Sequence, residues 1–126
     1  MREEILVFLE RARKFEEEAV ELFNKGVYDL SAFHIEQSLQ LYLKYILAKE
    51  LGYFPRTNKL SKLFSELANL NNDFQAFFED NEIILRDIED AYILSRYFPR
   101  DYSKREVEAM LNTLKKFKEK FREWIS

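Results

Sequence analysis

The segment from Tyr28 to Leu51 constrains the fold most, because it predicts one long helix that is apolar on nearly every side. It contains no Gly or Pro, and apolar side chains dominate from Leu39 to Ala48. A helix of this kind must be covered on several faces by other elements. One narrow polar stripe remains at roughly i, i+3, i+4 spacing. It consists of His34, Gln37, Ser38, Gln40 and Lys44. We therefore expect Tyr28–Leu51 to be the central helix.

The composition favours an all-helical fold around this segment. Gly and Pro occur twice each, whereas Leu, Glu, Lys, Phe and Ala are frequent, and this balance favours long helices over strands. With 126 residues, 47% of them hydrophobic and 34% charged, the chain is expected to form a single domain over residues 1–126 with a substantial core. No run of 18 apolar residues is present, so no membrane-spanning helix is expected.

Two further features point to the cytoplasm. The chain has no Cys, which fits a reducing compartment and excludes disulfides and thiolate zinc sites. It opens with Met1-Arg2-Glu3-Glu4, where a signal peptide would carry basic and then apolar residues. We therefore expect a cytoplasmic protein.

Hydrophobic periodicity predicts five helices joined by short connectors. They span Arg2 to Asn24, Tyr28 to Leu51, Thr57 or Asn58 to Leu70, Asp80 to Tyr97, and Ser103 to the end of the chain. Asp29 is predicted to cap the central helix, and Ser103 with Glu106 has the spacing of a capping box. Because helices joined by short loops pack antiparallel, we expect an all-α antiparallel bundle of four long helices plus a short fifth helix.

An aromatic group lies between the third and fourth predicted helices, in one or two helical turns. It consists of Phe74, Phe77 and Phe78 at i, i+3, i+4 spacing. This spacing places the three rings on one side, either in the core or at an interface. Together with an aromatic content of 16%, the group provides more apolar surface than five short helices need, so we expect a homodimer.

Charge is distributed unevenly along the chain. The net charge of −3 and the isoelectric point near 5.3 argue against nonspecific binding of duplex nucleic acid by the whole surface. Residues 71–90 have a net charge of −6 and residues 103–126 a net charge of +3, so the two segments could meet within the fold or across two subunits. The basic side chains of residues 115–122 could also contact phosphate, but i, i+4 pairing with Glu119 and Glu123 explains them equally well.

Most familiar catalytic and cofactor motifs are absent. The sequence contains no GxGxxG, P-loop, HExxH or Cys/His cluster, so we expect no cofactor and no metal site. We interpret the carboxylates of residues 79–90 as a solvated acidic face. His34, the single His of the chain, would be either a satisfied polar residue in a packing seam or a base or pH-dependent contact.

The segment from Ser95 to Tyr102 is the strongest candidate for a site. Two Arg, two Tyr and one Asp gather there between two predicted helices, and the N–H groups that open the last helix point into the same region. An anion would find guanidinium and N–H donors together. Alternatively, Arg96 and Arg100 cap the preceding helix and pair with Asp101.

Two stretches of the chain together resemble the HEPN domain family (higher eukaryotes and prokaryotes nucleotide-binding). They are Tyr28 through Lys44 with Gly52, Pro55 and Thr57 ahead of Leu60-Ser61-Lys62-Leu63, and Ala91-Tyr92 followed by Arg96-Tyr97-Phe98-Pro99. The order, spacing and chain length agree over nearly the whole chain. The resemblance implies a HEPN-like helical bundle, usually a homodimer. It also implies, for many members, a minimal nucleotidyltransferase as partner chain in prokaryotic toxin–antitoxin or defence systems.

The signature of the family's ribonucleases is incomplete in this chain. The resemblance implies an Arg followed four to six residues later by a His, both acting on RNA. The Arg is present as Arg96, but residues 101–103 are Asp, Tyr and Ser. We therefore expect a non-catalytic module that binds a nucleotide, RNA or a nucleotidyltransferase. Its predicted ligand-binding residues are Arg96, Tyr97, Arg100, His34 and Lys44. The alternative is a divergent metal-independent RNase that uses Arg96 with Asp101 or Tyr102.

Overall fold

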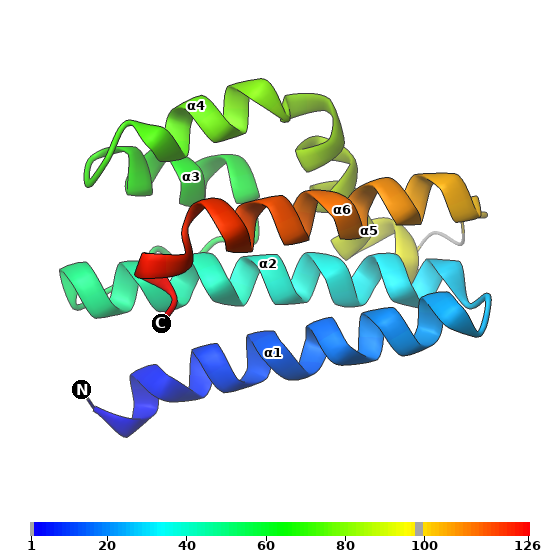
Figure 1. The fold of residues 1–126 in the computed structure, drawn as a ribbon, viewed down its shortest axis with the longest axis horizontal. Coiled ribbons are helices and arrows are strands. Elements are labelled where there is room, and N and C mark those ends of the chain that lie inside the picture. The colour runs from blue at the N-terminus through cyan, green and yellow to red at the C-terminus, as the bar shows by residue number, and fades with distance from the viewer. Residues whose placement is uncertain (1, 98–99) are drawn as a thin grey trace.

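Within the residues that the structure describes, the chain contains helices and no strand, as predicted (Figure 1). The structure is a computed structural model that describes residues 2–97 and 100–126, and for residues 94–97 it describes the backbone alone. The elements are α1 (Glu3–Asn24), α2 (Tyr28–Leu51), α3 (Leu60–Ala68), α4 (Asp73–Asp80), α5 (Glu82–Tyr97), α6 (Lys104–Lys120) and a 3-10 turn, η1 (Arg122–Trp124). None of these described helices has the combined length and apolar character that crossing a membrane requires.

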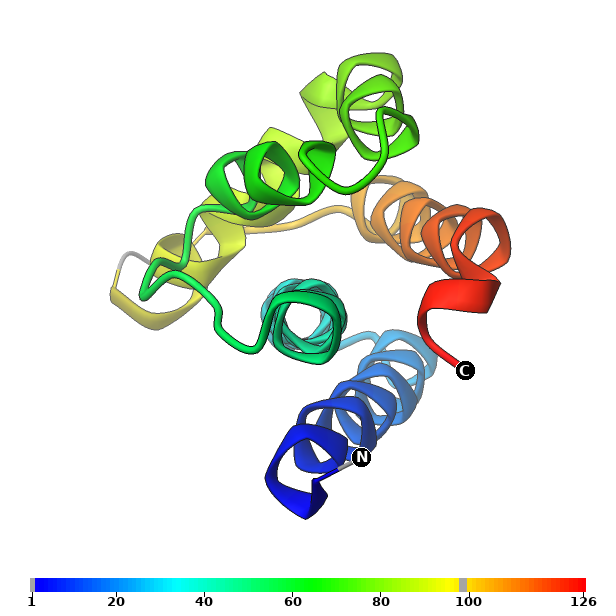
Figure 2. The ribbon, with the colours of Figure 1, turned by 90° about the vertical axis from the view of Figure 1, so that its left-hand side faces the viewer.

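Helix α2 is the centre of the fold. In the end-on view of Figure 2, α2 lies in the middle, with α1 on one side and α3, α5 and α6 around the others. Helices α1 and α2 form an antiparallel hairpin, and α6 runs in the same direction as α2 (Figure 1). Most side chains from Leu39 to Ala48 are buried, because neighbours cover this helix on several faces. The prediction of a central helix is therefore confirmed.

Small residues line the contact between α1 and α2. Ala12 and Ala19 of α1 are fully buried, and the hydroxyls of Ser31 and Ser38 of α2 donate to the carbonyl oxygens of Ala19 and Ala12, each at 2.7 Å. These bonds satisfy two hydroxyls that have no access to water. Ser38, which the sequence analysis assigned to the narrow polar stripe of α2, therefore lies in the contact between α1 and α2.

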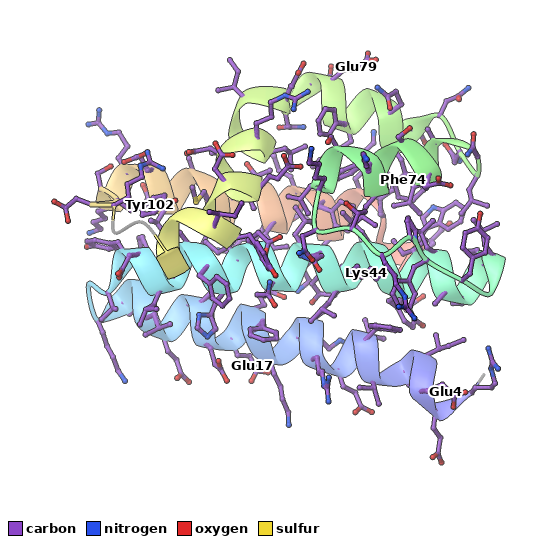
Figure 3. The ribbon with its side chains drawn as sticks, turned by 180° about the vertical axis from the view of Figure 1, so that it is seen from behind. Glu4, Glu17, Lys44, Phe74, Glu79 and Tyr102 are labelled. Carbon is purple, nitrogen blue, oxygen red and sulfur yellow. The ribbon has the colours of Figure 1, made fainter. Side chains whose placement is uncertain are left out.

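The three Phe residues of α4 lie in the core. Phe74 is fully buried, and Phe77 and Phe78 are nearly so. The ring of Phe74 stacks on that of Phe121, at the end of α6, with centroids 4.2 Å apart and planes at 10°. Figure 3 shows Phe74 within the part of the bundle where α3, α4 and the C-terminal segment meet. These rings therefore give no support to a homodimer, because their apolar surface is already covered within one chain.

The aromatic segment forms a helix of its own, so the described residues contain six α-helices instead of the five predicted. The break comes at Asn81, whose backbone leaves the helical region at φ −124° and ψ 24°. Its side-chain amide donates to the carbonyl of Phe77 at 2.9 Å. Asp80 consequently ends α4 and does not begin the next helix. Helices α1, α2, α5 and α6 have 22, 24, 16 and 17 residues, whereas α3 and α4 have 9 and 8.

The predicted helix caps are partly correct. Val27, and not Asp29, is the N-cap residue of α2, and the Asp29 carboxylate accepts from the adjacent N–H within the first turn. Ser103 and Glu106 form the predicted capping box, in which each side chain accepts from the other's backbone N–H at 3.1 Å. This capping box fixes the start of α6 and thereby the position of the Glu106 side chain.

Candidate functional site

Arg100 bridges two acidic side chains at the corner between α5 and α6. Its Nη1 donates to Oδ1 of Asp87 at 3.1 Å, and its Nη2 donates to Oε2 of Glu106. The guanidinium carbon lies 4.1 Å from the centroid of the Tyr102 ring, a cation–π contact. The ion-pair partners of Arg100 are therefore Asp87 and Glu106, and the interpretation that paired it with Asp101 is wrong.

In the described part of the corner, Arg100 connects two helices through ion pairs. Asp87 belongs to α5 and Glu106 to α6, so Arg100 links the elements on either side of residues 98–99. The Arg100 side chain is 33% exposed and meets two carboxylates, which gives the three groups a net formal charge of −1. An incoming anion would therefore meet two carboxylates beside the Arg100 guanidinium.

The other residues predicted for this corner have different environments. Tyr102 is 5% exposed and lies at the end of the bundle shown in Figure 3, whereas Asp101 is exposed. Arg96 and Tyr97 belong to the last turn of α5, but their side chains lie outside the described part of the structure. The structure therefore brings together Arg100 and Tyr102, and it leaves Asp101 in contact with solvent.

His34 lies in the contact between α1 and α2. Its Nδ1 is 2.7 Å from the carbonyl oxygen of Leu30, and its Nε2 is 3.0 Å from Oε2 of Glu18. The Phe15 ring packs beside it, with centroids 5.4 Å apart. Because both polar partners are acceptors, both contacts are hydrogen bonds only when each ring nitrogen carries a proton. The imidazole thus has its partners on α1 and on its own helix.

Lys44 ends a polar network on α2. Its Nζ donates to Oε1 of Gln40 at 2.8 Å, and the amide of Gln40 donates in turn to Oε2 of Glu36 at 2.8 Å. The amide of Gln37 donates to the other oxygen of Glu36 at 2.7 Å. Burial lowers the pKa of Lys44. Figure 3 shows Lys44 well along the bundle from Tyr102, so the two residues belong to different sites.

Glu36 is a buried titratable residue that the sequence analysis did not single out. Its side chain is fully buried. This burial raises the pKa of Glu36 from its ordinary 4.5 to about 7, and the amide bonds from Gln37 and Gln40 and the charge of Lys44 oppose the shift only in part. The available signal was the spacing of Glu36, Gln40 and Lys44 at i, i+4 and i+8, which places three polar side chains on one helix face.

The fold and the corner define a small helical-bundle domain with a charged turn ahead of its last helix. The HEPN domain model matches residues 5–124, nearly the whole chain, and the chain therefore belongs to the HEPN family. This match confirms the resemblance carried by the two stretches of sequence. HEPN domains are helical domains of a nucleotide-binding and RNase-type family. A search of curated proteins found no match to this chain.

Proposed function

We propose that this chain is a dimeric HEPN module that binds a nucleotide at the α5–α6 corner and does not cleave RNA. Arg96 and Tyr97, in the last turn of α5, and Arg100 would face the anionic part of the ligand. The partner that the family resemblance implies is a minimal nucleotidyltransferase chain of a toxin–antitoxin or defence system. His34 has its partners on α1 and α2, and Lys44 has its partner on α2, so they are not part of this proposed site.

The position of the single histidine supports the proposal most strongly. His34 is held between the Leu30 carbonyl and the Glu18 carboxylate in the α1–α2 contact. A second copy of the chain would bring no imidazole other than its own His34. For either copy to supply a base at the corner, His34 would first have to leave both partners. The corner therefore lacks the imidazole that proton transfer by the family's Arg–His signature requires.

The residues that stand where the missing His would be are also unsuited to acid–base catalysis. The Tyr102 ring is buried against the Arg100 guanidinium. Asp101 is an exposed carboxylate, which would repel a phosphate group. Arg100 is already neutralised by two carboxylates. These environments do not favour acid–base cleavage of RNA by Asp101 or Tyr102.

Incubation of the purified protein with RNA tests the proposal. We expect wild type, Arg96→Ala and His34→Ala to leave RNA equally intact, because no acid–base pair is assembled at the corner. Arg105→Ala removes an exposed cation of α6 and serves as the matched control. RNA cleavage by wild type and Arg105→Ala that disappears in Arg96→Ala would support the alternative function, a divergent metal-independent RNase.

An apolar patch on α2 and α5 supports the homodimer in this proposal. Leu30 and Ile93 are 43% and 50% exposed. Leu30 lies one helical turn before Phe33, and Ile93 follows Tyr92. The ring centroids of Phe33 and Tyr92 lie 6.4 Å apart, so the patch spans adjoining helices. HEPN domains commonly dimerise. The patch also adjoins the last turns of α5, which would place two copies of the corner near each other.

Ile93→Glu should convert the dimer into a monomer, because a carboxylate would be buried without a partner at the interface. The measurement is the molar mass from light scattering at micromolar protein. Ile83→Glu is the matched control, since Ile83 lies on the same helix, is 90% exposed and is not part of the patch. A wild-type monomer would contradict the dimer, and an Ile93→Glu dimer would contradict this interface.

A further inference from the structure

A basic groove of about 390 Å³ lies between α1 and the C-terminal half of α6, away from the start of α6 where the corner lies. Four cations line it: Arg13 of α1, Lys115 and Lys118 of α6, and Arg122 of η1. Glu119 is the acidic side chain of the lining and Glu16 pairs with Lys118 beside it, so these six side chains carry four positive and two negative charges, a net charge of +2. This local excess stands out in a chain whose net charge is −3.

Buried neighbours fix the backbone that carries these cations. Arg13 follows Ala12, which is fully buried against α2. Arg122 follows Phe121, which is 2% exposed and stacks on Phe74. The turn η1 then brings the last residues of the chain toward α1, as Figure 2 shows. The groove is therefore a product of three packed elements and not of one mobile segment.

A carboxylate beneath the groove holds Lys118 and Tyr42 in place. Oε1 of Glu16 accepts from the Tyr42 hydroxyl at 2.8 Å, and the two oxygens of Glu16 lie 2.8 and 3.0 Å from Nζ of Lys118. Burial of Tyr42 and its bond to Glu16 raise the pKa of the phenol far above its usual value, so the hydroxyl stays a donor. Glu16 is thereby committed to internal partners and positions Lys118 at the edge of the groove.

Three of the four cations remain open to a ligand. Arg13, Lys115 and Arg122 are exposed, and none of them makes an ion pair with another residue that the structure describes. Lys and Arg donate short, charge-assisted hydrogen bonds to phosphate oxygens. We infer that this groove binds a di- or triphosphate group, either inorganic or carried by a nucleotide. This site goes beyond the proposed function, because none of its residues belongs to the corner.

The geometry favours a compact polyphosphate over a nucleic-acid strand. The cations come from both walls and from one end of a single pocket, so they converge on one volume. A pocket of this size suits a small ligand. Proteins that bind single strands usually offer exposed rings for base stacking. The aromatic residue of the described lining is Tyr42, which is fully buried and whose hydroxyl is bonded to Glu16.

Titration of the protein with inorganic tripolyphosphate tests the inference. Binding is measured by calorimetry and by the change in Trp124 fluorescence. Trp124 is the single Trp of the chain and precedes Ile125 of the groove lining. We expect wild type to bind, and Lys115→Ala and Arg122→Ala each to bind about tenfold more weakly, the loss typical of one charge-assisted contact. Lys116→Ala is the matched control, because Lys116 is exposed on the same helix but does not line the groove. Glu119→Gln should tighten binding, since it removes the repelling charge.

Further measurements distinguish polyphosphate binding in the groove from binding at the corner and from RNA binding. ATP should compete with tripolyphosphate, adenosine should not, and Arg96→Ala should leave tripolyphosphate binding unchanged. The inference is overturned if wild type gives no heat with millimolar tripolyphosphate, or if Lys115→Ala and Arg122→Ala bind like wild type. It is also overturned if a short single-stranded RNA without a terminal phosphate binds the groove more tightly than tripolyphosphate. Loss of tripolyphosphate binding in Arg96→Ala, with unchanged binding by Lys115→Ala and Arg122→Ala, would place this ligand at the corner and overturn the groove.

Discussion

Phe121→Ala is expected to lower the free energy of unfolding by about 3 to 5 kcal/mol, the loss typical of truncating a packed core Phe. Phe121 is 2% exposed, and its ring contacts those of Phe74 at 4.2 Å and Phe117 at 5.0 Å between centroids. Because these neighbours come from two different helices, the cavity cannot close without moving α4 relative to α6. Urea denaturation followed by circular dichroism measures the change.

Two further variants provide reference values for the free energy of unfolding of Phe121→Ala. Phe121→Leu keeps part of the buried volume and should be less destabilising than Phe121→Ala. Tyr53→Ala alters a ring that is 57% exposed, and it should change the free energy of unfolding by no more than about 0.5 kcal/mol. If Phe121→Ala were no more destabilising than Tyr53→Ala, the aromatic cluster between α4 and α6 would not be a packed core.

Glu36→Gln is expected to stabilise the protein above neutral pH, by an amount on the order of 3 kcal/mol. Burial raises the pKa of Glu36 from 4.5 to about 7, with the nearby charge of Glu89 adding to the shift and Lys44 opposing it. Between these two pKa values the folded chain keeps a proton that the unfolded chain has lost. The stability of wild type therefore falls by about 1.4 kcal/mol per pH unit from this group as the pH rises through that window. An amide in place of the carboxyl removes this dependence.

The measurement is the difference in unfolding free energy between Glu36→Gln and wild type across the pH range. We expect the difference to be small below about pH 4 and to reach its full size above about pH 8. Glu10→Gln, at an exposed position of α1, is the matched control and should change stability by less than about 0.5 kcal/mol. A difference that stays constant with pH would show that Glu36 titrates alike in the folded and unfolded chains.

Local patterns in the sequence predict much of this fold. The all-round apolar character of Tyr28–Leu51 identifies the central helix, because only a covered helix can carry it. The spacing of Ser103 and Glu106 identifies the helix cap, because the two capping residues are only three positions apart in the chain. Periodicity could not decide whether the α4 rings lie in the core or at an interface. The spacing shows that they share one face of a helix, but not which element covers that face.

The interactions that the sequence did not reveal join residues that are distant in the chain. Lys118 and Glu16 are 102 positions apart, and Arg100 pairs with Asp87 from the preceding helix, 13 positions away. Neither pair has a periodic signal, so only the packing of the helices brings them together. Glu36 had a local signal in its spacing from Gln40, but its burial depends on which helices cover that face of α2.

The assay that tests the central claim most directly is incubation of 5′-labelled single-stranded RNA with an excess of the purified protein. The claim is that this HEPN module lacks RNase activity, because its only imidazole, His34, is held in the α1–α2 contact. The account predicts full-length RNA with wild type and with Arg96→Ala alike. Shorter labelled products that wild type generates and Arg96→Ala does not would contradict it, and would assign RNA cleavage to a site that requires Arg96.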